Sequence, residues 1–77
     1  MSKIILYDCG PEVTHMVNNL FGEKVVIQNS SFDAKRPLQE FSMVILETGS
    51  KKPEQLLQEI KALRYACNFR NIPITLF

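Results

Sequence analysis

Two carboxylates follow apolar runs of the kind that form buried strands. Asp8 comes directly after residues 4–7, and Glu47 closes the run at residues 42–46. In an open α/β sheet, ligands bind outside the carboxyl ends of the strands. We therefore expect Asp8 and Glu47 to converge on one rim of a sheet. There they form either a cation or regulatory site or simply a pair of solvated loop carboxylates.

Cys9 follows Asp8 and stands just before Gly10-Pro11, which is typical of a helix start. A thiol near a helix N-terminus can have a lowered pKa, so a redox sensor at Cys9 is one open interpretation. Cys9 and Cys67 have neither zinc-type nor Cys-x-x-Cys spacing, and reduced thiols are the expected state. His15 has no second ligand at i+4, and we expect it to be exposed.

Composition restricts the class of protein. A chain of 77 residues allows one small domain, and its net charge of +1 with interspersed charges gives no basic stripe for nucleic acid. Lys51-Lys52 is the nearest basic cluster, and we expect it to lie in a solvated loop. The apolar run 4–7 is far too short for a signal peptide or a membrane span. We expect a cytoplasmic protein.

Strand-like and helix-like segments alternate along the chain. The strands are expected at 1–7, 24–28, 42–46 and 72–77, and the alternation predicts a parallel sheet with the order βαβαβαβ. Pro37 interrupts the segment 32–41, where we expect only one or two turns that pack Leu38 and Phe41.

Two strong helices are predicted, and each begins at a proline. Their expected buried sides are Val13, Met16, Val17, Leu20 and Phe21 in the helix from Pro11 to Gly22, and Leu56, Leu57, Ile60, Leu63 and Cys67 in the helix from Pro53.

The order of these segments resembles that of bacterial response-regulator receiver domains. Residues 3–8 with Pro11-Glu12 look like the receiver's first strand, acidic loop and first helix, and residues 43–47 look like its phosphoacceptor strand. Residues 56–61 and 71–74 look like its third helix and fourth strand. The resemblance covers the whole chain but only about the first two-thirds of the family's domain. It implies a flavodoxin-like open parallel α/β sheet in the order 2-1-3-4, with helices on both faces, as one truncated domain over 1–77.

Departures from the family pattern set the functional expectation. Receivers hold a divalent cation with two adjacent acids, and here the second position is Cys9. The family's phosphoacceptor Asp matches Glu47, whose longer side chain displaces the carboxylate, and a misplacement of about 1 Å can cost about 100-fold in rate. The family's hydroxyl and Lys positions would fall after Phe77. We expect a non-catalytic signalling module without a cofactor. The alternative is a genuine phosphoryl acceptor that binds Mg²⁺ at Asp8 and Glu47.

The resemblance also predicts a surface for protein contacts. The family's last helix has no counterpart, so one side of the third and fourth strands should be bare and the fourth strand should form an open edge. We expect Ile74, Leu76 and Phe77 to form an interface. Its occupant is either a second copy, giving a homodimer, or the remainder of a longer chain.

Overall fold

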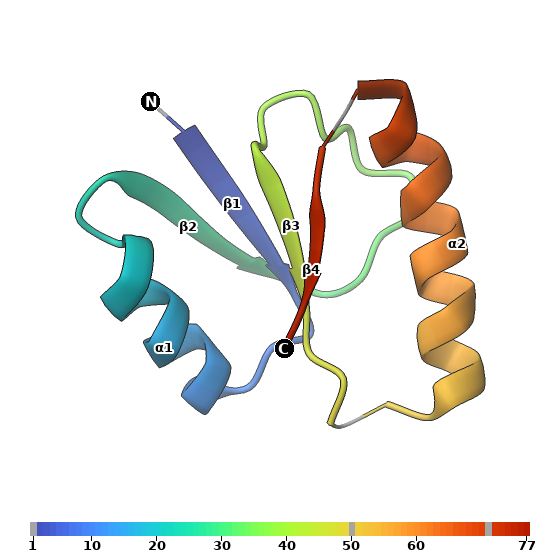
Figure 1. Cartoon of the computed structure of the whole chain (residues 1–77), viewed down its shortest axis with the longest axis horizontal. Helices are drawn as coiled ribbons and strands as arrows, with labels where there is room; N and C mark the ends of the chain where they lie inside the picture. The colour runs from blue at the N-terminus through green and yellow to red at the C-terminus, as the bar shows by residue number, and fades with distance from the viewer. Residues whose placement is uncertain (1, 50, 71) are drawn as a thin grey trace.

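The computed structural model describes residues 2–49, 51–70 and 72–77, and for residues 66–70 it describes the backbone alone. Its elements in chain order are β1 (Ser2–Tyr7), α1 (Pro11–Phe21), β2 (Val25–Ser30), β3 (Met43–Leu46), α2 (Pro53–Arg70) and β4 (Ile74–Leu76). The strands form one sheet with a helix on each side of it (Figure 1).

The sheet has four strands in the order β2-β1-β3-β4, and every pair is parallel. Tyr7 of β1 lies opposite Ser30 of β2 and Leu46 of β3, so these three strands end at the same level. The predicted flavodoxin-like α/β sheet with order 2-1-3-4 is confirmed. Because all strands run the same way, the segments that follow them meet at one rim.

Each face of the sheet carries its own apolar cluster. On the α1 side, Val17 packs with Ile4, Leu6 and Ile45. On the α2 side, Leu63 packs with a larger buried group that comprises Ile5, Tyr7, Leu38, Phe41, Val44 and Leu46. The central strands are apolar throughout β3 and from Ile4 to Tyr7 of β1, as expected for strands with both faces covered. The prediction of helices on both faces is confirmed.

The segment 31–42, which joins β2 to β3, contains turns and no helix. It lies between the sheet and α2 (Figure 1), and its Leu38 and Phe41 are buried, as predicted. The element order in the described residues is therefore βαββαβ, and the predicted βαβαβαβ was wrong at this segment. Pro37 accounts for the difference, since proline cannot donate the hydrogen bond that a helix interior needs.

The predicted buried sides of the two helices are only partly correct. In α1, Val17 is buried and Val13 and Phe21 are partly buried, whereas Met16 and Leu20 are exposed. The sheet therefore contacts a narrower stripe of α1 than the apolar pattern offers.

In α2, Leu63 is buried and Leu56 and Ile60 pack beside it, but Leu57 is 54% exposed. The side chain of Cys67 lies outside the described residues. Glu59 is buried instead of Leu57, at 8% exposure. Leu56, Glu59 and Leu63 are spaced by three and four residues and share one face of the helix, which places Leu57 on its flank.

The strands β3 and β4 are better covered than the resemblance predicted. Ile45 on the α1 side is fully buried, and Phe77 packs on that side beside it. On the opposite side, Ile74 is partly buried and Leu76 is 48% exposed. The bare face expected across β3 and β4 is therefore wrong for β3.

None of the described helices is long and apolar enough to cross a membrane.

Candidate functional site at the carboxyl ends of the strands

Asp8 and Cys9 follow β1, and Glu47 follows β3, at the carboxyl ends of adjacent parallel strands. The loop before α2 contributes Lys51 to the same rim. The sheet thus brings together the carboxylates singled out in the sequence. What these groups do is decided by their hydrogen bonds.

The Glu47 carboxylate holds the loop that leads into α1. Its Oε1 accepts a hydrogen bond of 2.9 Å from the backbone N–H of Gly10, the residue that caps α1. A Cβ atom at Gly10 would lie only 3.3 Å from this oxygen, so the glycine permits the close approach. A negative charge at this end of a helix is also favoured by the helix dipole. The Glu47 carboxylate therefore already has a structural partner within the chain, the backbone N–H of Gly10.

Asp8 has a backbone φ of 54°, the one positive value recorded among the described residues. Aspartate tolerates this left-handed conformation better than most residues. Its N–H donates to the carbonyl of Ser30 at 2.9 Å, and its Oδ1 accepts a hydrogen bond of 3.3 Å from the N–H of Phe32. Asp8 thereby ties β1 to the start of the 31–42 segment.

Lys51 forms the centre of the rim. Its ammonium group lies 3.1 Å from Asp8 Oδ2 and also pairs with the carboxylate of Glu59, while only 5% of the side chain is exposed. Glu59 also accepts a hydrogen bond of 3.1 Å from Gln55 Nε2. The ammonium lies 5.7 Å from the centre of the Phe32 ring, within the range of a cation–π interaction. Burial opposes the charge on Lys51, but hydrogen bonds to Glu59 and Asp8 outweigh it and raise its pKa.

The expectation of a solvated Lys51-Lys52 pair was therefore wrong for Lys51, although Lys52 is exposed. Neither the burial of Lys51 nor the role of Glu59 was predicted. One signal was available, because Glu59 is a charged residue three positions after Leu56 and four before Leu63, on the apolar side of α2. A carboxylate on such a face needs a partner, since a buried charge is costly unless it is paired.

Cys9 is partly buried beneath the rim. Its Sγ lies 3.6 Å from the carbonyl oxygen of Tyr7 and 3.8 Å from that of Ile45. Burial, together with the nearby charges of Glu47 and Asp8, raises the pKa of the thiol to about 11 despite the opposing charge of Lys51. The lowered pKa considered for a redox sensor is therefore wrong, because burial and two carboxylates outweigh the charge of Lys51 and the backbone hydrogen bond at Glu47, which act to lower the pKa.

His15 is exposed on α1. Within the part of the chain that the structure describes, no three His, Cys, Asp or Glu side chains are grouped so that they could hold a metal ion. The rim instead consists of two ion pairs and a set of hydrogen bonds to backbone N–H groups.

No family model, curated protein or solved structure matches this chain.

Proposed function

We propose that this chain is a non-catalytic, receiver-like signalling module of the cytoplasm that acts through protein contacts, including self-association. One observation carries the non-catalytic part of the proposal. The Lys51 ammonium occupies the acidic rim, where it is held between Asp8 and Glu59.

A divalent cation at Asp8 would have to displace Lys51. Both carboxylate oxygens of Asp8 are already bonded, one to Lys51 and the other to the N–H of Phe32. Displacement would also leave the buried Glu59 without its cation, and breaking a buried ion pair is strongly unfavourable. Glu47 is bonded to Gly10 and would have to leave the α1 loop to accept a phosphoryl group. These contacts favour a structural role for the rim.

The edge of β4 supports the part of the proposal that concerns protein contacts. β4 pairs with β3 on one side. On that same side, the N–H of Phe77 donates to the carbonyl of Leu46, and the carbonyl of Phe77 accepts from the N–H of Thr48. Because successive residues of a strand direct their backbone groups to opposite sides, the groups of Leu76 point to the other edge. Leu76 also exposes 48% of its surface. An exposed strand edge with an apolar side chain is a template for pairing with another strand.

Sedimentation velocity over a dilution series tests the self-association. We expect a dimer that the Leu76→Lys substitution converts to monomer, because a charged edge residue opposes strand pairing. Leu57→Lys is the matched control, since Leu57 is similarly exposed but lies on α2. A monomeric parent chain at micromolar concentration, or equal loss of dimer in both variants, would contradict self-association through β4.

Intact-mass measurement after incubation with acetyl phosphate and Mg²⁺ tests the non-catalytic part. We expect no added phosphate, because neither rim carboxylate is available. A phosphate adduct that disappears in the Glu47→Gln variant would establish the phosphoryl-acceptor alternative instead.

A further inference from the structure

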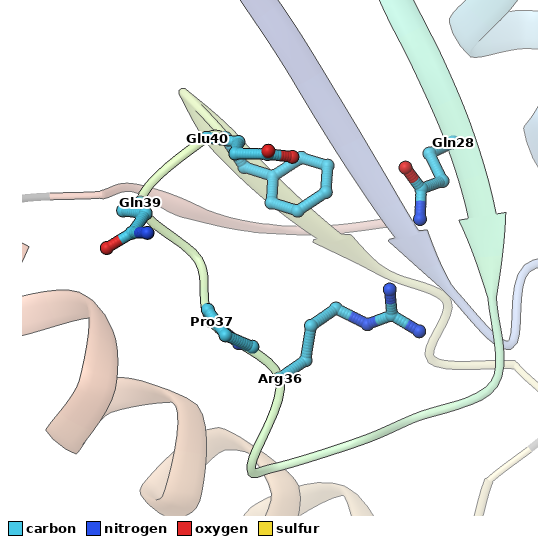
Figure 2. A pocket seen from close by; sticks show the side chains of 6 residues that line it. Gln28, Arg36, Pro37, Gln39 and Glu40 are labelled. Atoms are coloured by element: carbon cyan, nitrogen blue, oxygen red, sulfur yellow. The ribbon is translucent and has the colours of Figure 1, made fainter.

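A cavity of about 280 Å³ lies between β2 and the 31–42 segment, and its lining includes none of the rim residues Asp8, Glu47 and Lys51. It is lined by Gln28 of β2 and by Arg36, Pro37, Gln39, Glu40 and Phe41 (Figure 2). Its position follows from the fold. Gln28 lies opposite Ile5 and so shares the α2 side of the sheet, where the irregular 31–42 segment covers β2 less completely than a helix would.

Arg36 contributes a guanidinium group with unused hydrogen-bonding capacity. Its Nη2 donates to Ser30 Oγ at 2.8 Å, but its Nε is buried and has no hydrogen-bond acceptor in the described part of the protein. No described carboxylate lies within ion-pair distance of Arg36. Leaving a buried donor unpaired is unfavourable, and more so on a charged group. The Ser30 bond uses one of the five N–H donors of the guanidinium, and the remaining Nη donors can bind an acceptor from outside the chain.

The other lining groups indicate which kind of molecule would fit. Figure 2 shows the Glu40 side chain across the cavity from the Arg36 guanidinium. Phe41 and Pro37 supply apolar surface, and Glu40 is held by Lys3 at a distance of 3.4 Å. The cavity thus combines a cationic fork, an apolar wall and a carboxylate.

We propose that this cavity binds a small organic carboxylate of amino-acid size. The ligand's carboxylate accepts hydrogen bonds from Arg36, which presents planar donors that match a carboxylate. Its apolar body lies against Phe41 and Pro37, and an ammonium group on the ligand faces Glu40. A phosphate is disfavoured, because it has no apolar body to lie against Phe41 and Pro37, and Arg36 is the one cationic residue among those described as lining the cavity.

Proton–nitrogen NMR of the labelled chain, with the arginine Nε–H signals included, tests the proposal with three probes. L-leucine carries both charged groups, 4-methylpentanoate lacks the ammonium, and 3-methylbutylamine lacks the carboxylate. We expect saturable shifts at the Arg36 Nε–H and at the Gln28 and Phe41 amides with leucine, weaker binding with 4-methylpentanoate, and none with the amine. No shift with either carboxylate, binding of the amine, or tighter binding of inorganic phosphate would overturn the proposal.

Variants then identify the groups responsible. Arg36→Lys keeps the charge but removes the fork, and we expect leucine to bind about tenfold or more weakly, as for loss of a charge-assisted hydrogen bond. Arg64→Lys is the matched control on the exposed side of α2 and should bind as the parent does. Glu40→Gln should reduce the preference for leucine over 4-methylpentanoate. Unchanged binding in Arg36→Lys, with the amide spectrum showing an intact fold, would refute the assignment of Arg36.

Discussion

Lys51 Nζ lies 3.1 Å from Asp8 Oδ2, so the loop before α2 carries the cation that neutralises the acidic residue after β1. Through Glu59 the same ammonium reaches α2, and through Asp8 it reaches the backbone of Phe32. One side chain therefore connects the end of β1, the start of the 31–42 segment and the second helix. The ion pairs at the rim therefore hold these three parts of the fold together.

Substitution of Lys51 by Met should destabilise the protein by about 3 kcal/mol, because it leaves the buried Glu59 carboxylate without a cation. The free energy of unfolding, measured by urea titration with circular dichroism, checks this value. Lys52→Met is the matched control, since Lys52 is exposed and such changes usually stay within about 0.5 kcal/mol. Equal effects at the two lysines would show that the ion pair does not stabilise the fold.

Stability should fall as the solution becomes alkaline. The pKa of Cys9 is raised from 9.0 to about 11, and that of Lys51 is raised above 10.5. A folded pKa above the unfolded value means that the proton favours the folded state. The contribution of Cys9 is thus complete below pH 9.0 and is lost as the pH rises to about 11, while that of Lys51 is lost above 10.5. Unfolding free energies from pH 8 to 11 should show this decline, and Cys9→Ser should remove its earlier part.

Cys9 should react slowly with iodoacetamide in the folded protein. The thiolate is the nucleophile, and a pKa of about 11 in place of 9.0 lowers its fraction at pH 8 about 100-fold. Peptide mass spectrometry should therefore find Cys9 alkylated far more slowly in buffer than in urea. Rapid and selective modification of Cys9 in the folded state would restore the redox interpretation.

Replacing Glu47 by Ala should cost about 1 to 2 kcal/mol of stability, since it leaves the Gly10 N–H without its acceptor and removes a charge from the N-terminus of α1. Glu47→Gln keeps an oxygen that can accept from Gly10 and should recover most of the loss. Thermal unfolding of the two variants compares them directly. An equally stable Ala variant would show that the carboxylate does not hold the loop.

The sheet could be predicted because strand order depends on the alternation of strand and helix segments, which can be read directly from the sequence. Apolar runs such as 42–46 alternate with prolines at helix starts, and right-handed crossovers leave few arrangements. The positions of Asp8 and Glu47 at strand ends followed from the same pattern. The partners of these carboxylates could not be predicted in the same way. Asp8 pairs with Lys51, which lies 43 residues later in the chain, on a loop whose path depends on tertiary packing.

The buried sides of the two helices could also be predicted only in part from the sequence. A hydrophobic pattern identifies the broad apolar side of a helix, but the contact stripe is narrower and is chosen by the neighbouring sheet. In α2 this choice turns Glu59 inward, where Lys51 is available, and leaves Leu57 outside. In α1 it leaves Leu20 at 63% exposure. A paired charge can thus take a position that hydrophobicity alone would assign to leucine.

Two leucines of α2 make this choice measurable with identical substitutions. Leu63 is 1% exposed within the larger cluster, whereas Leu57 is 54% exposed. Leu63→Ala should therefore cost about 3 kcal/mol through lost burial and a residual cavity, and Leu57→Ala should change stability by less than about 0.5 kcal/mol. Urea unfolding at low protein concentration checks both values. If Leu57→Ala proved as costly as Leu63→Ala, α2 would be rotated about its axis relative to the sheet, and Glu59 could not be the inward partner of Lys51.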